Sequence, residues 1–114
     1  MPGSFSGETE IVTLTEWSNT MQKVKVSNMT SPSTGREIAN QFLIETDDGI
    51  FFQSYATIIA VKQRNGDPIM LDSNSWDYSK TTGKYRNRFL GCDKKETEKR
   101  IKSGQYLLAD LNRE

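Results

Sequence analysis

Two short turn signals set between runs of β-forming residues constrain this fold more than any other feature of the sequence. The signals are Asp48-Gly49 and Asn65-Gly66. Both dipeptides are favoured at the tips of two-residue β-hairpins, because they tolerate positive φ. The apolar segments on either side of them are 38–45, 50–53, 57–62 and 69–71. The pattern therefore predicts two consecutive hairpins, which form an antiparallel sheet with one buried face.

Further strands are expected on both sides of these hairpins. Short alternating segments at 10–14 and 24–26 are typical of strands, and 105–111 is expected to rejoin the sheet as a terminal strand. Residues 1–9 are expected to form a flexible arm, which leaves 10–112 as a single domain. A chain of 114 residues is long enough for one hydrophobic core but not for two.

Two short helices are predicted between the hairpins and the terminal strand. Ser79 is a suitable N-cap for a helix that ends at Leu90, with Thr81 or Thr82 as alternative caps. Gly91 follows at the position where helices favour a left-handed residue. The predicted fold class is therefore α+β, with an antiparallel β-meander of about four to six strands packed by two short C-terminal helices.

The second predicted helix covers residues 94–102 and has its own start and stop signals. Asp93 is expected to cap it, and Ser103-Gly104 closes it. Glu96 follows the cap at the spacing from which an acidic side chain reaches back to the cap amide.

The first helix and the residues before it carry four aromatic side chains. Together with Thr82, three of them fall at spacings of three and four residues (Tyr78, Thr82, Tyr85 and Phe89), which predicts a single helix face. Trp76 is expected to anchor the entry to the helix. An aromatic stripe of this kind is typically core. The expected packing partners on the sheet are Phe42, Ile44, Phe51 and Ile59.

The same helices carry a concentration of cations. Lys80, Lys84 and Arg88 recur every four residues with Arg86 nearby, and the second helix adds Lys95 and Lys99. Residues 80–102 contain nine basic and three acidic residues, although the formal net charge of the chain is zero. Like charges four residues apart destabilise a helix by a few tenths of a kcal/mol per pair, so a compensating interaction is expected.

Three interpretations of this basic face remain open. It is a solvated face balanced by nearby acids, a phosphate or nucleic-acid contact, or a docking surface for an acidic protein. No zinc knuckle, ribonucleoprotein aromatic motif or GXXG clamp supports nucleic-acid binding. A homodimer is a further alternative, since 105–111 or 10–14 would leave an open sheet edge for a second copy.

Catalysis is not expected. The chain has no histidine, which excludes Ser-His-Asp and Cys-His mechanisms and imidazole metal sites. Lys84 lacks the upstream glycine and the following Ser or Thr of a phosphate-binding P-loop. Cys92 is the one cysteine, so no internal disulfide forms, and we expect a structural thiol, no metal and no cofactor.

The sequence predicts a cytoplasmic protein. The longest apolar run, 58–61, is too short to cross a bilayer, so no membrane contact is expected. The first ten residues have neither the basic nor the apolar region of a secretory signal.

Several segments resemble a family of small proteins from bacteriophages and mobile elements. The similarity is carried by GREIANQF (35–42), FFQSY and IIA (51–55 and 58–60), WDYSKTTGKY (76–85), FLG (89–91) and RIKSGQY (100–106), and it extends over roughly 35–111. The resemblance implies a non-catalytic phage-type accessory protein in a bacterial cytoplasm. It would bind a host protein or a nucleic acid, for instance to inhibit a defence system.

Overall fold

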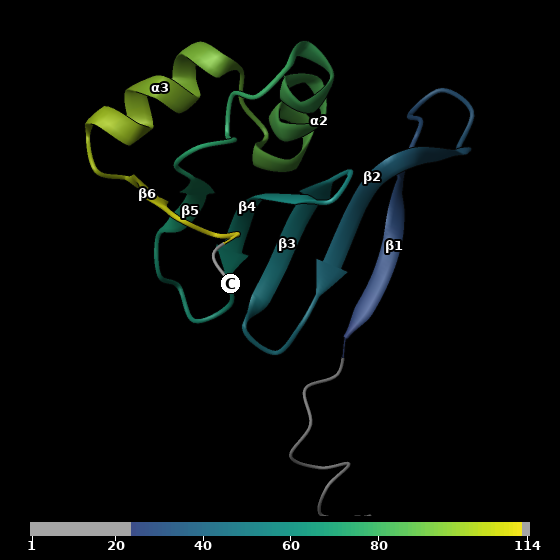
Figure 1. Ribbon diagram of the computed structural model, residues 1–114, viewed down its shortest axis with the longest axis horizontal. Coiled ribbons are helices and arrows are strands. Elements are labelled where there is room, and N and C mark those ends of the chain that lie inside the picture. Colours follow the sequence, from purple (N-terminus) through teal and green to yellow (C-terminus); the bar gives the residue numbers. More distant parts are fainter. Residues whose placement is uncertain (1–23, 113–114) are drawn as a thin grey trace, which may run out of the picture.

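A computed structural model describes residues 24–112, which form one sheet and two helices (Figure 1). The strands are β1 (Lys25–Thr30), β2 (Glu37–Glu45), β3 (Gly49–Ser54), β4 (Thr57–Gln63), β5 (Ile69–Asp72) and β6 (Tyr106–Ala109). The helices are α2 (Lys80–Leu90) and α3 (Lys94–Lys102). The strand order in the sheet is the chain order, from β1 at one edge to β6 at the other.

This architecture confirms the α+β prediction, with one correction to the sheet. Strands β1 to β5 pair antiparallel with their neighbours, whereas β6 runs parallel to β5. The reason is the connection, since the two helices lie between β5 and β6 and form the crossover that parallel strands require. The expected arm at 1–9 and strand at 10–14 lie outside the described residues.

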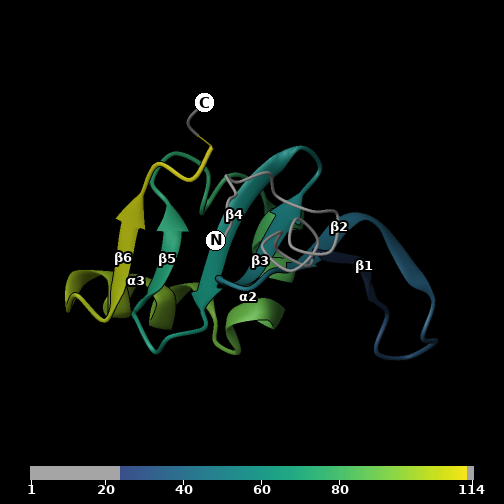
Figure 2. The ribbon, with the colours of Figure 1, turned by 90° about the horizontal axis from the view of Figure 1, so that it is seen from below.

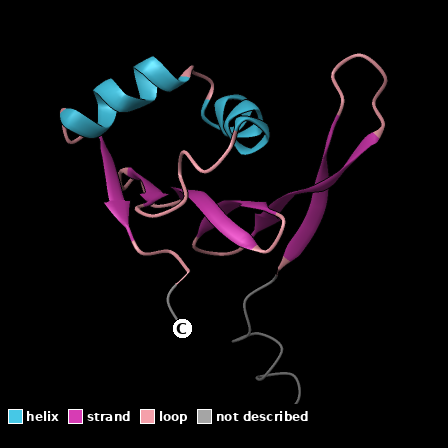
Figure 3. Cartoon of the chain, turned by 45° about the horizontal axis from the view of Figure 1, so that its top comes forward, coloured by secondary structure: helices cyan, strands magenta, loops and turns pink. Residues whose placement is uncertain are grey.

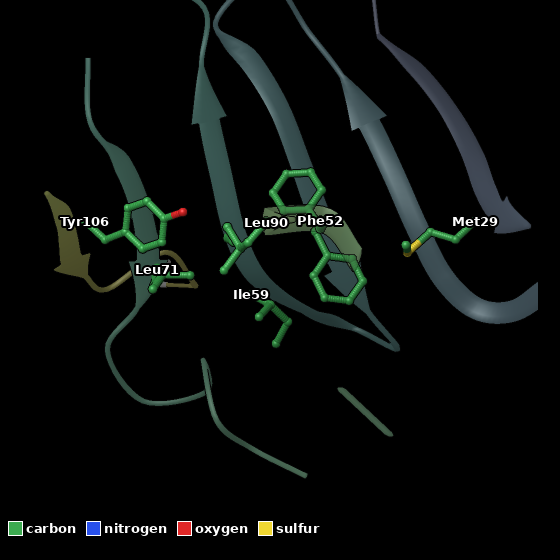
Figure 4. Packing of buried hydrophobic residues seen from close by; sticks show 8 residues of the cluster. Met29, Phe52, Ile59, Leu71, Leu90 and Tyr106 are labelled. Atoms are coloured by element: carbon green, nitrogen blue, oxygen red, sulfur yellow. The ribbon is translucent and has the colours of Figure 1, made fainter. Parts of the chain in front are cut away.

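Both helices lie on the same side of the sheet (Figure 3). The core forms between them and the sheet face turned towards them, where Phe52, Leu71 and Tyr106 from the strands meet Leu90 from α2 (Figure 4). Phe89 of α2 belongs to the same cluster. The rings of Phe52 and Phe89 are stacked, with centroids 5.7 Å apart. A polar contact adds to this packing, because the buried hydroxyls of Ser54 and Thr82 lie 3.0 Å apart.

The expected contacts of the first helix with the sheet were mostly wrong. Of the four predicted partners, only Ile59 belongs to the core cluster, and Phe42, Ile44 and Phe51 do not pack against it. Successive strand residues point to opposite faces, so Phe52 on the helix side places Phe51 on the other side. Ile44 pairs with Phe51 and shares its face.

Gly49 has a different role from the one that its sequence context predicts. The turn between β2 and β3 is closed by reciprocal backbone hydrogen bonds between Thr46 and Gly49, so Asp47 and Asp48 occupy its tip. Gly49 opens β3 with φ +155°, and the Lys62 carbonyl oxygen occupies the space that a Cβ would take. Glycine is therefore required here by the close approach of β4.

Replacing Gly49 with alanine tests this steric explanation. We expect Gly49→Ala to lower the free energy of unfolding by roughly 3 kcal/mol, since it combines backbone strain with a forced shift of β4. Gly66→Ala is the matched control, because Gly66 has φ +86° with open space around it. It should cost only about 1 kcal/mol. Urea denaturation measures both, and equal losses would contradict the explanation.

Candidate docking surface on the two helices

Helix α2 begins and ends where the sequence predicts. The Ser79 side chain accepts a hydrogen bond from the Thr82 amide, which satisfies a free donor of the first turn. Gly91 adopts φ +77°, and its N–H donates to the Asn87 carbonyl. These caps fix the length of the helix.

Helix α3 is capped as predicted by Asp93, whose carboxylate accepts from the Glu96 amide. The Glu96 side chain was expected to reach back to the cap amide, and this detail was wrong. It accepts a hydrogen bond from Arg100 Nε at 2.7 Å, one helical turn further on. The charged guanidinium four residues later is a stronger donor to the Glu96 carboxylate than a neutral backbone amide would be.

Five of the exposed cations on the two helices form what we call the helical basic surface: Lys80, Lys84, Arg88, Lys95 and Lys99. Lys80 and Lys84 line a shallow hollow together with Lys94. Lys95 and Lys99 line a second one beside Cys92. Arg88 is held in place, since its guanidinium donates to the Thr30 carbonyl at 2.7 Å.

The four lysines of this surface have no ion-pair partner among residues 24–112. Lys84 lies over the Tyr85 ring at 5.4 Å from its centroid, which is a cation–π contact. The charges of these four lysines therefore contribute little to the stability of the described fold.

Arg86 was predicted to belong to this face, and the structure corrects that prediction. Its side chain is only 1% exposed. Nη1 donates to the Trp76 carbonyl at 2.8 Å, Nη2 donates to the Asn87 side chain at 2.9 Å, and the guanidinium stacks over the Trp76 ring. Two residues after Lys84, the helix has turned by about 200°, which points Arg86 inwards.

Three of the four aromatic anchors pack as expected. Phe89 is buried, and Trp76 and Tyr85 are half-buried against the core cluster. Tyr78 is 72% exposed, so its assignment to the buried face was wrong. It precedes the Ser79 cap and is not helical, so the spacing that defines a helix face does not apply to it.

Asp77 connects the loop before α2 to the start of α3. Its carboxylate accepts from Lys94 Nζ at 2.7 Å and lies 3.4 Å from Arg86 Nη1. The hydrogen bond from Lys94, opposed by partial desolvation and supported by Arg86, lowers the pKa of Asp77. The same pair raises the pKa of Lys94.

Sequence reasoning missed a half-buried polar cluster beneath α3. Arg100 Nη1 donates to the Tyr106 hydroxyl at 2.9 Å, and Cys92 Sγ lies 3.4 Å from the Thr97 hydroxyl. Burial raises the pKa of Tyr106, although the hydrogen bond from Arg100 acts in the opposite direction. The cluster joins α3 to β6. The sequence signal for it was the spacing of Thr97 and Arg100 with Ile101 on one helix face.

Within the described part of the chain, no three side chains of the metal-binding types gather into a site. Neither helix there is long and apolar enough to cross a membrane. Fold and surface together define a small α+β protein with a charged helical layer on one face of its sheet.

The family of the protein follows from a family model that covers most of the described residues. The model for a family of unknown function (DUF8033) matches residues 24–104, and the chain belongs to this family. The match includes β1 to β5 and both helices. Searches of curated proteins and of solved structures returned no match.

Mutation can test whether Arg86 stabilises the fold while the exposed Lys84 does not. We expect Arg86→Met to lower the free energy of unfolding by about 3 kcal/mol, since the substitution leaves the Trp76 carbonyl and the Asn87 amide without their charged donor. Lys84→Met is the control and should change stability by no more than about 0.5 kcal/mol. Urea denaturation compares them. Similar losses in the free energy of unfolding for the two variants would show that Arg86 contributes no more to stability than a surface cation does.

The lowered pKa of Asp77 predicts a pH-dependent contribution to stability. A carboxyl group with a depressed folded-state pKa stabilises the protein above its unfolded value of about 3.9, and this contribution is lost as the pH falls through the folded-state pKa. We therefore expect wild type to be more stable than Asp77→Asn at pH 7, with a difference that begins to shrink near pH 3.9 and disappears only once the pH has fallen through the lower folded-state pKa. Thermal unfolding from pH 2 to 7 measures it.

A variant of Lys94, the ion-pair partner of Asp77, supplies the control for this pH dependence. In a Lys94→Met background, the effect of Asp77→Asn at pH 7 should be smaller, because the main cause of the pKa shift has been removed. An unchanged effect would show that the Lys94–Asp77 pair is not its source.

Proposed function

We propose that this protein is a non-catalytic binding protein whose helical basic surface docks an acidic surface of a partner protein. The observation that carries the proposal is the set of lysines that project from α2 and α3 without ion-pair partners in residues 24–112. Complementary charge would steer the partner to this surface and raise the association rate.

The spacing of the cations supports a role outside folding. Lys80, Lys84 and Arg88 repeat at intervals of four, an arrangement that costs the helix a few tenths of a kcal/mol per pair. The buried residues of α2, such as Thr82 and Phe89, hold the helix to the sheet and tolerate this electrostatic cost. They do not require cations on the opposite side of the helix. An anionic partner would offset this repulsion on binding.

Carboxylates among the cations favour a protein partner over a nucleic acid. Asp77 lines the hollow of Lys80 and Lys84, and Asp93 and Glu96 line the hollow of Lys95 and Lys99. The surface therefore presents groups of both signs side by side, which suits the mixed charges of a protein surface better than a backbone that carries phosphates alone. Nucleic-acid binding through the same cations is the alternative.

The setting that we infer is a bacteriophage or mobile element acting in a bacterial cytoplasm. The inference is supported by the resemblance of segments such as WDYSKTTGKY (76–85) to proteins from such elements. In this setting, the partner would be a host or phage protein, and the proposed consequence of binding is inhibition of a host defence system.

Charge reversal on the two helices tests the proposal. We expect the variant Lys80→Glu/Lys84→Glu/Lys95→Glu/Lys99→Glu to lose the partners that the wild-type protein captures from a host lysate at low salt. The control is Lys25→Glu/Arg36→Glu, which reverses two exposed charges on the β1–β2 hairpin and is compared with Lys80→Glu/Lys84→Glu, which reverses two on α2. The control should capture the same partners as wild type. If all of these proteins captured the same partners, the helical basic surface would have no part in binding.

A gel-shift titration with duplex and single-stranded DNA distinguishes docking of a protein from the alternative, which is nucleic-acid binding. The proposal predicts no shift of either DNA at low salt. A shift that weakens with salt and is lost in the four-lysine variant would instead assign the surface to nucleic acid.

A further inference from the structure

The two hollows on the helical layer differ in their balance of charge. The hollow between α2 and the start of α3, which we call the α2 hollow, is lined by Asp77 and by four cations: Lys80, Lys84, Arg86 and Lys94. The hollow beside α3 is lined by two lysines and two carboxylates: Lys95, Lys99, Asp93 and Glu96. The helices lie over different strands, α2 over β3 and α3 over β6 (Figure 2). The excess of positive charge is therefore local to the α2 hollow.

Arg86 is a lining group of the α2 hollow that the fold removes from water. Its side chain is 1% exposed, and its Nε has no hydrogen-bond acceptor among the described residues. The Asp77 carboxylate lies 3.4 Å from Arg86 Nη1 but 2.7 Å from Lys94 Nζ, so two cations share it. A buried charge is costly unless it is paired. Asp77 therefore compensates the charge of Arg86 only in part.

The α2 hollow also reaches the positive end of the α2 helix dipole. The N-cap Ser79 and the first helical residue, Lys80, line it, and the first turn contains no acidic residue. Helix starts favour anions, because the first N–H groups point outwards and carry partial positive charge. Helix α3 follows this rule with Glu96 in its first turn. In α2 a lysine occupies that end instead, so an anion from outside would complete the helix start.

Gly83 lines the same hollow, and the fold does not explain why this position is glycine. Its φ is not positive, and a Cβ there would lie 3.5 Å from Arg86 Nη2, which is an ordinary van der Waals contact. Alanine would fit and would favour the helix, because glycine loses more backbone entropy on folding. A bare backbone lets a bound group approach the helix and the guanidinium closely, which is a reason to retain glycine.

We propose that the α2 hollow binds a phosphate monoester carried by a phosphorylated side chain of the partner protein. Four cations against one carboxylate leave three positive charges in the lining. A carboxylate would neutralise one of them, whereas a phosphate monoester carries about −1.5 to −2 at pH 7 and offers three acceptor oxygens. Lys80, Lys84 and Lys94 supply the exposed donors. The assignment of the phosphate to a docked protein rests on the function proposed above.

The confinement of the charge favours one isolated phosphate over a run of them. A nucleic-acid strand presents phosphates along its whole length and needs a positive surface that continues from one to the next. The neighbouring hollow, with its two carboxylates, does not continue the excess charge. A single phosphorylated side chain requires only the α2 hollow.

An NMR titration of the full chain tests the site with two blocked tripeptides at equal ionic strength. The probe is acetyl-Gly-phosphoserine-Gly-amide, and the control is acetyl-Gly-Glu-Gly-amide. We expect the phosphopeptide to shift the amide signals of Ser79, Gly83, Asn87 and Lys94, and the glutamate peptide to bind about tenfold more weakly. No shift with the phosphopeptide, or equal affinity for both peptides, would overturn the proposal.

Matched variants locate the binding of the phosphopeptide. Lys80→Gln/Lys84→Gln should abolish it, whereas Lys95→Gln/Lys99→Gln should bind as wild type does, since these lysines line the other hollow. Equal weakening by both pairs would reveal non-specific attraction and refute the site. Gly83→Ala should raise the midpoint of urea unfolding and still weaken binding several-fold, because the added methyl group covers the guanidinium. Unchanged binding by this variant would contradict the approach of the phosphate to the guanidinium.

Phosphatase treatment of the lysate separates this inference from the proposed function. Dephosphorylation before capture should abolish the binding of partners to the wild-type protein. Partners that survive phosphatase but are lost with the four-lysine variant would leave the docking surface intact and overturn the phosphate site. Phosphopeptide binding, together with capture that charge reversal does not change, would support the site and count against the docking surface.

Discussion

The buried guanidinium of Arg86 is the interaction on which the arrangement of the helices depends. A cation removed from water needs several good partners, and Arg86 finds the Trp76 carbonyl, the Asn87 amide, the Trp76 ring and the Asp77 carboxylate. Asp77 in turn binds Lys94 at the start of α3. One side chain thus joins the loop after β5 to both helices. It also fixes the rotation of α2 about its axis, which turns Lys80 and Lys84 outwards.

The parts of the fold that the sequence predicts are those determined within a few residues. Ser79, Gly91 and Asp93 mark helix ends through hydrogen bonds to neighbouring amides or through one backbone angle, and all three were placed correctly. Strand segments follow the same rule, since β-branched and aromatic runs favour extended backbone. The direction of β6 was not predictable in this way. It depends on how the whole helical crossover returns to the sheet.

The errors at the candidate site come from choices between two faces. Arg86 was grouped with Lys84 because both are cations, although Thr82, Arg86 and Phe89 have the spacing of a single buried face. For the sheet, the run Ile50-Phe51-Phe52 offers an apolar residue to each side, so the sequence alone does not determine which ring meets the helix. Only Phe52 does, through its stack with Phe89.

That ambiguity in the strands has a physical cause, namely that the central strands are apolar on both faces. The protein therefore has two different surfaces, a charged one on the helices and an apolar one on the opposite face of the sheet. A strand buried on one face alternates between apolar and polar residues, whereas β3 and β4 are apolar on both faces. The charges of the C-terminal half are concentrated on the helices, about 10 Å from the sheet plane. Binding through those cations depends on salt, because exposed charges are screened. Contacts through apolar residues on the opposite face of the sheet, such as Ile44, Phe51 and Met70, carry no charge to screen, so ionic strength distinguishes an effect at one surface from an effect at the other.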